Sequence, residues 1–165
     1  MENKSVTINY FEYNRIEELE ELHQVLLKKA EHALTSAYAP YSGFKVGAAV
    51  LLENGIIVTG NNQENAAYPS GLCAERVALF AASSQYPGIP FKAIAITAKA
   101  KDFTVNYPVS PCGSCRQVMN EYENLFKTSL KIILKGETGK IIVLENVGGL
   151  LPFSFTSEQL NLSEK

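Results

Sequence analysis

Two apolar segments near the end of the chain, 130–134 and 140–144, are separated by only five residues, Lys135-Gly136-Glu137-Thr138-Gly139. Parallel neighbouring strands need a crossover connection of about a dozen residues or more, whereas antiparallel neighbours can be joined by a tight turn. The two segments are therefore predicted to be antiparallel neighbours and the last two strands of the chain.

Before this pair, segments typical of strands alternate with segments typical of helices. A first hairpin is predicted by the apolar segments 44–52 and 56–59, which flank the tight-turn sequence Glu53-Asn54-Gly55. Helices between strands elsewhere imply parallel strand pairs. The other predicted elements are a strand at 92–98, helices at 16–37, 73–85 and 112–123, and loops at 60–72 and 101–111.

These elements predict an α/β fold with a mixed five-stranded sheet, helices on both faces and the last two strands antiparallel. A length of 165 residues, with 46% hydrophobic and 19% charged residues, fits one globular domain. Residues 1–13 have no periodicity and are interpreted as an N-terminal extension on the surface. Residues 14–165 are interpreted as a single catalytic domain.

Charge and hydrophobicity limit the partners of the protein. The formal net charge is -2, and no run of Lys or Arg is longer than a pair. Binding to a nucleic-acid backbone usually needs clustered cations, so no nucleic-acid partner is expected. The N-terminal sequence lacks an apolar stretch after a basic start, and no segment has the length of a membrane helix. We expect a cytoplasmic protein without a membrane partner.

Three cysteines are the candidate metal ligands. Cys112 and Cys115 are three residues apart at the start of one predicted helix, and Cys73 opens another. An odd number of cysteines is poor material for a disulfide framework. The positive end of a helix favours thiolate over thiol. Three thiolates predict tetrahedral zinc with one open position, which is typical of a catalytic site.

The simpler alternative is that the three cysteines are buried apolar residues. Glu75 argues against it, because a carboxylate two residues after Cys73 could exchange protons with a water that the metal activates. The sequences Cys73-Ala-Glu and Pro111-Cys-x-x-Cys also match the pattern that defines zinc deaminases. The two histidines, His23 and His32, fall in the first helix and are interpreted as a partly packed and a solvated residue.

Arg76 follows the candidate acid/base residue directly. Three thiolates and Zn²⁺ leave a net charge of -1 (three negative charges and two positive), which makes a metal-activated water less acidic. Hydrogen bonds from Arg76 to the ligand sulfurs, together with the two helix dipoles, would offset that charge. The alternative for Arg76 is a surface ion pair.

The chain closely resembles the cytidine deaminase family in five sequence segments, 39–49, 62–68, 73–76, 111–117 and 150–152. The resemblance implies a cytidine deaminase-like three-layer fold with one zinc ion per subunit. It further implies a hydrolase of pyrimidine salvage, which converts cytidine and 2′-deoxycytidine to uridine and 2′-deoxyuridine and releases ammonia. The preference between the two nucleosides stays open.

The resemblance also implies roles for residues that bind the nucleoside. Asn62 and Glu64 are expected to hold the ribose hydroxyls, Phe44 to stack on the pyrimidine, and the backbone N–H of Ala74 to bind the base carbonyl. The small members of the family are homotetramers with shared active sites. The resemblance therefore implies that Phe153 or Phe155 reaches a neighbouring pocket, and the spacing favours Phe155. Each of these residues could instead serve only a turn or local packing.

The sequence disfavours three other functions. A deaminase of RNA or DNA is disfavoured by the missing basic stripe and by the short connection before the last strand. A deaminase of nucleoside-like antibiotics would share the zinc sequence but depart at Asn62 and Glu64. A zinc-stabilised binding module would give Glu75 no role.

Overall fold

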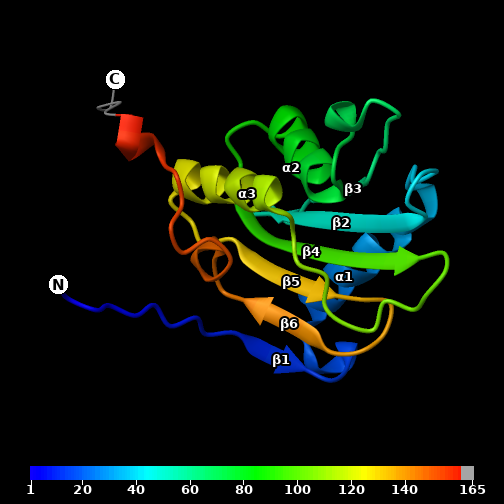
Figure 1. Cartoon of the computed structure of the whole chain (residues 1–165), viewed down its shortest axis with the longest axis horizontal. Coiled ribbons are helices and arrows are strands. Elements are labelled where there is room, and N and C mark those ends of the chain that lie inside the picture. Colours follow the sequence, from blue (N-terminus) through cyan, green and yellow to red (C-terminus); the bar gives the residue numbers. More distant parts are fainter. Residues whose placement is uncertain (161–165) are drawn as a thin grey trace.

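The computed structural model describes residues 1–160 as a mixed sheet with helices packed on both faces (Figure 1). Within these residues the strand order is β1-β6-β5-β4-β2-β3. In chain order the elements are β1 (Phe11–Tyr13), α1 (Glu21–Ala33), β2 (Phe44–Leu52), β3 (Ile57–Asn61), α2 (Ala74–Gln85), β4 (Phe91–Ala100), α3 (Gly113–Phe126), β5 (Lys131–Lys135) and β6 (Ile141–Leu144).

The structure confirms the predicted α/β class, the helices on both faces and the antiparallel pairing of the last two strands of the chain. β5 and β6 pair antiparallel, with Ile133 opposite Val143. β2 and β3 form the predicted antiparallel hairpin. β4 and β5, which are joined through α3, are parallel neighbours as expected. β3 and β4, which are joined through α2, are not neighbours, because β2 lies between them.

The sheet of the described residues has six strands and not the predicted five. The additional strand is β1, which comes from the segment interpreted as a surface extension and pairs antiparallel with β6. Its side chains are exposed except for the half-buried Tyr13, which packs against the core. Three residues on an exposed edge are too few to show the alternation that identifies a strand. The boundary between residues 1–13 and a domain of residues 14–165 stays a prediction.

The predicted helix at 16–37 is divided into three parts. A 3₁₀ turn covers Ile16–Glu18, α1 begins at Glu21, and a second 3₁₀ turn covers Leu34–Ser36. Between the first two parts, Leu19 has an extended backbone and Glu20 a non-helical one. Leu19 is nevertheless buried, so the apolar spacing continues across the break and hides it from the sequence.

Two apolar cores lie on opposite faces of the sheet. Alternate residues of β2 face opposite sides, so that Val50 belongs to the core under α2 and α3, and Leu51 to the core under α1. Figure 1 shows α1 on the other side of the sheet from α2 and α3. The α1 side chain of His23 is only 12% exposed, and this burial lowers its pKa, whereas His32 is exposed. Both histidines therefore have the partly packed and solvated positions expected of them.

A close backbone approach fixes α2 against β3. A Cβ atom at Gly60 of β3 would overlap the amide nitrogen of Ala78 and lie 2.7 Å from the carbonyl oxygen of Ala74. Only glycine allows helix and strand to come this close. The first turn of α2, which follows Cys73, is therefore held directly on the sheet.

The packing of β1 leads to a prediction about stability. Tyr13→Ala should lower the free energy of unfolding by about 1–2 kcal/mol, because the ring is half-buried against the core. Tyr10→Ala is the matched control: its ring is 55% exposed, so the loss should stay below about 0.5 kcal/mol. Urea denaturation measures both losses. Equal, small losses would show that β1 adds nothing to the stability of the fold.

Candidate active site

The three cysteines converge from two helix starts. Cys73 is the N-cap residue of α2, Cys112 is the N-cap residue of α3, and Cys115 lies in the first turn of α3. The Sγ atoms of Cys73 and Cys112 are 3.8 Å apart, and those of Cys112 and Cys115 are 3.5 Å apart. All three sulfurs lie within 4.8 Å of one another.

This arrangement fits zinc. With Zn–S bonds of about 2.3 Å, tetrahedral coordination separates the sulfurs by about 3.8 Å, close to the two short separations observed. In the part of the chain that the structure describes, no fourth Cys, His, Asp or Glu joins this cluster. Three soft donors with the fourth position left to a small molecule are the donor set of a catalytic zinc site.

The electrostatics of the cluster favour a thiolate at Cys73. Its hydrogen bond with Cys115, assisted by Arg76 and Cys112, lowers the pKa of Cys73. The same hydrogen bond, together with burial, raises the pKa of Cys115. Nη2 of Arg76 lies 3.8 Å from the Cys73 sulfur, and Nε of Arg76 is buried without a protein partner. Arg76 thus adds positive charge beside the sulfurs, as the sequence suggested.

Glu75 is a carboxyl group shielded from solvent beside the cysteines. The residue is 4% exposed, and this burial, followed by the negative charge of Cys73, raises the pKa of Glu75. A carboxyl group whose pKa moves toward neutrality can both accept and donate protons at physiological pH. Its position and its environment suit a general acid/base.

A cavity of about 620 Å³ opens above Glu75. Seven of the predicted site residues line it, together with residues from both long loops and from the segment before β2. The lining residues are Tyr41, Ser42, Phe44, Val46, Asn62, Gln63, Glu64, Asn65, Tyr68, Gly71, Leu72, Cys73, Glu75, Arg76, Val109, Ser110 and Cys112. A space of this size suits a small-molecule ligand.

The two predicted ribose ligands are held by backbone groups. Oδ1 of Asn62 accepts a hydrogen bond from the amide of Val46 (2.8 Å), and its Nδ2 donates to the carbonyl oxygen of Phe44 (2.9 Å). The Glu64 carboxylate accepts hydrogen bonds from the Ser42 hydroxyl and from the amide of Tyr41, the latter at 2.9 Å. These bonds, the Ser42 hydroxyl first, lower the pKa of Glu64. Glu64 therefore faces the cavity as an ionised acceptor.

Ala74 and Phe155, the other two predicted nucleoside-binding residues, are not among the residues that line the cavity. Ala74 is the first residue of α2, where backbone N–H groups have no acceptor within the helix. Phe155 does not line the cavity of its own subunit, and its ring is 55% exposed. Its carbonyl oxygen accepts hydrogen bonds from Gln117 (2.8 Å) and Asn120 (3.4 Å), so its backbone is bound to α3 although more than half of the residue is exposed.

Ten residues of the cavity wall were not among the predicted site residues, among them two tyrosines and two residues of the connection before α3. Tyr41 and Tyr68 form an edge-to-face pair, with ring centroids 6.4 Å apart. Val109 and Ser110 come from the connection between β4 and α3. These four residues could have been identified from their positions, because all of them lie within or beside segments that resemble the family.

Fold and site together define an α/β domain with a zinc site built from three cysteines. A family model described as the cytidine and deoxycytidylate deaminase zinc-binding region matches residues 20–128. A cytidine deaminase of Halalkalibacterium halodurans is 44% identical over 138 residues, which cover 84% of this chain and 97% of the relative. A cytidine deaminase of Sporosarcina psychrophila is 42% identical over 82% of this chain and 93% of the relative.

Solved structures give the same result. The crystal structure of a cytidine deaminase from Burkholderia pseudomallei has a TM-score of 0.70 and 41% identity, and the match covers 81% of this chain and 98% of that chain. The cytidine deaminase of Mycobacterium tuberculosis has a TM-score of 0.63 and 34% identity, with coverage of 81% and 97%. The chain belongs to the cytidine deaminase family.

The geometry of the cluster predicts the effect of removing one ligand. Cys112→Ala should lose zinc and stability together, because metal binding and folding are coupled. Metal analysis of the purified variant should find less than about one-tenth of the wild-type zinc, and the unfolding midpoint should approach that of chelator-treated wild type. Ser114→Ala, which changes a neighbouring residue outside the cluster, is the control. Full zinc occupancy in Cys112→Ala would remove Cys112 from the site.

Proposed function

We propose that the protein is a zinc-dependent hydrolase that deaminates cytidine and 2′-deoxycytidine. The products are uridine or 2′-deoxyuridine and ammonia, which places the enzyme in pyrimidine salvage. The observation that carries the proposal is the buried Glu75 beside three convergent cysteines at a cavity of about 620 Å³. The names of the related proteins support the choice of substrate.

In the proposed mechanism, Cys73, Cys112 and Cys115 would hold a zinc ion, which would lower the pKa of water and so supply a nucleophile at neutral pH. Glu75 takes a proton from the water that attacks C4 of the base. It then passes this proton to N3, takes the remaining proton from the new C4 hydroxyl and delivers it to the amine, so that the C4–N bond breaks, ammonia leaves and the C4 carbonyl forms. Burial suits Glu75 for both directions of transfer, because a raised pKa makes the protonated carboxyl group available near neutral pH.

Nucleoside binding is assigned to groups around the cavity. Glu64 is ionised and can accept hydrogen bonds from ribose hydroxyls, since two carboxylate oxygens offer about four acceptor sites. Asn62 keeps a second amide hydrogen for a ribose oxygen. Phe44 is assigned to stacking on the pyrimidine, and the backbone N–H of Ala74 to the base carbonyl. Arg76 is assigned to offsetting the negative charge of the thiolates.

We further propose a homotetramer with shared active sites. Large apolar side chains are exposed on α2 and on the segment after β6: Phe80 is 43% exposed, Phe153 86% and Phe155 55%. Apolar groups that a single subunit leaves exposed are commonly buried by association. Contact between subunits would bring Phe155, which is absent from the cavity of its own subunit, to the cavity of a neighbour.

Membrane and nucleic-acid partners are not part of the proposed function. Among residues 1–160, no helix has the length and apolar character needed to cross a membrane. A cytoplasmic location and the absence of a nucleic-acid partner stay predictions from the sequence.

The activity is tested on free nucleosides and on polymers. Wild-type protein should convert cytidine and 2′-deoxycytidine, with loss of ultraviolet absorbance and release of ammonia, and should leave cytosine-containing oligonucleotides unchanged. Glu75→Gln should keep zinc and fold but lose about 10²–10⁴-fold in kcat, because the amide cannot transfer protons. Glu64→Gln is the control, since it should act mainly through KM. Activity of Glu75→Gln within about tenfold of wild type, with zinc intact, would overturn its assignment.

Shared pockets are tested by mixing subunits. Phe155→Ala should raise KM for cytidine while the zinc content stays full, because a contact to the base is lost. Subunits carrying Phe155→Ala still have Glu75, and inactive Glu75→Gln subunits still have Phe155. Mixed tetramers should therefore regain pockets with the wild-type KM. A monomer by light scattering, or mixed samples without such pockets, would exclude the shared site.

A further inference from the structure

The turn between β5 and β6 packs directly on the connection between β4 and α3. The backbone amides of Glu137 and Thr138 both donate to the carbonyl oxygen of Val105, at 2.7 and 3.1 Å. Val105 is fully buried although its neighbours in the connection are exposed. The turn thus fixes one buried point of the connection, on both sides of which the adjoining residues are exposed.

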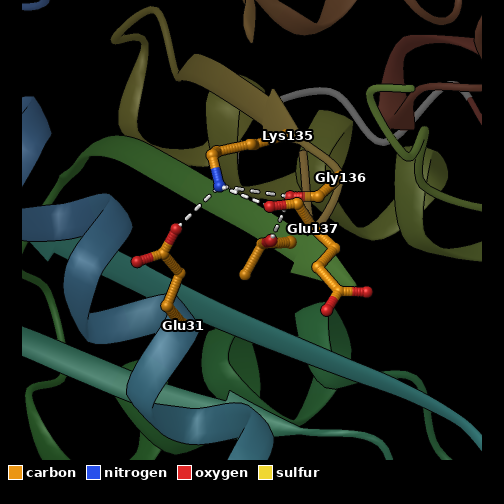
Figure 2. A network of polar contacts seen from close by, with 5 residues as sticks. Glu31, Lys135, Gly136 and Glu137 are labelled. Atoms are coloured by element: carbon orange, nitrogen blue, oxygen red, sulfur yellow. Dashed lines mark hydrogen bonds and ion pairs between the residues drawn. The ribbon is translucent and has the colours of Figure 1, made fainter. Parts of the chain in front are cut away.

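Lys135 ties this turn to the rest of the fold. Figure 2 shows its amine between the Glu31 carboxylate of α1 and the carbonyl oxygens of Gly136 and Glu137. The three distances from Nζ are 2.9, 3.3 and 3.3 Å. The hydroxyl of Thr97 in β4 also donates to the Gly136 carbonyl, at 3.1 Å. The Lys135 side chain is only 15% exposed, so little water competes for these bonds.

Two glycines allow the turn to touch the connection backbone to backbone. A Cβ atom at Gly136 would lie 2.5 Å from the carbonyl oxygens of Val105 and Tyr107. A Cβ atom at Gly139 would overlap the carbonyl oxygen of Asn106, and Gly139 also has a φ of +85°. No side chain separates the two segments there, so a displacement of one must move the other.

The connection continues from this contact into the active site. Val109 and Ser110 line the cavity, and Cys112 follows as a predicted zinc ligand. The far end of the segment is also fixed, because Nε of Arg116 donates to the carbonyl oxygen of Pro111 at 2.8 Å. The segment between Val105 and Pro111, which contributes Val109 and Ser110 to the cavity wall, is therefore held at both of its ends.

We propose that the β5–β6 turn, held by Lys135, positions this cavity wall and Cys112 for catalysis. The turn and Lys135 contact neither the cavity nor the cysteines, so Lys135 is a positioning residue that acts through Val105. The inference rests on the proposed deaminase function for its effect on KM. Its effect on the backbone and on zinc retention does not depend on which substrate is used.

The test compares two glycine substitutions of equal backbone strain. Gly139→Ala and Gly55→Ala both force alanine into a left-handed conformation, with φ values of +85° and +84°. Nothing lies within 4 Å of a Cβ atom at Gly55, whereas the Gly139 variant must displace the connection at Asn106. Only Gly139→Ala should speed amide hydrogen exchange in residues 103–110 and the transfer of zinc to a chelator. It should also raise KM for cytidine about tenfold, because a cavity wall displaced by as much as about an ångström contacts the substrate less well.

A second pair of variants keeps the test decisive if Gly139→Ala does not fold. Lys135→Met removes the amine but keeps the length of the side chain. Lys131→Met is its control on the same strand, since Lys131 pairs with Glu145 at 3.5 Å, away from the turn. Lys135→Met should reproduce the faster exchange and zinc transfer, and Lys131→Met should leave both within about twofold of wild type.

The outcomes separate the two proposals. If neither Gly139→Ala nor Lys135→Met changes exchange in residues 103–110 or zinc transfer beyond its control, the positioning role is overturned. If wild-type protein fails to deaminate nucleosides while exchange and zinc transfer change as expected, the deaminase function fails and the positioning role stands.

Discussion

The direction of β2 is the constraint on which the active site depends. β3 and β4 both pair antiparallel with β2, so they run in the same direction and end at the same edge of the sheet. The chain passes from the end of β3 to α2 and from the end of β4 to α3, so both helices begin near this edge. Cys73 and Cys112 are the N-cap residues of these helices, and their sulfurs meet there. The first residue of β2, Phe44, is opposite Ala100 and reaches the same edge from the other direction.

The site could be predicted where its catalytic residues lie close together in the sequence. Cys112 and Cys115 share one helical turn, and Glu75 follows Cys73 by two residues, so local spacing and the family resemblance together indicate a zinc deaminase. The strand Phe44–Leu52 was predicted at its observed bounds, because eight of its nine residues are apolar or small and clear turn signals flank it. The structure adds the convergence of the three sulfurs. The binding roles of Phe44, Asn62, Glu64, Ala74 and Phe155 stay predictions.

The parts that the sequence did not reveal depend on partners that are distant along the chain. β1 has no recognisable pattern of its own and is defined only by pairing with β6. Lys135 and Glu31 are 104 residues apart, and their ion pair cannot be read from two residue types that are common on surfaces. The break after Glu18 is hidden because Leu19 keeps the apolar spacing in an extended conformation. In each case local periodicity is compatible with several structures, and tertiary contacts select one.

The residues assigned to the ribose also stabilise the strand assigned to the base. Asn62 binds the backbone of Phe44 and Val46 on both sides of its amide, and Glu64 binds the amides of Tyr41 and Ser42. Side chains held by several backbone hydrogen bonds have little rotamer freedom left to lose when a ligand binds. The same bonds fix the start of β2 and hence the ring of Phe44. In the proposed binding mode, recognition of the ribose and stacking on the base are therefore coupled through the backbone at the start of β2, so a change at Asn62 or Glu64 should also disturb contacts with the pyrimidine.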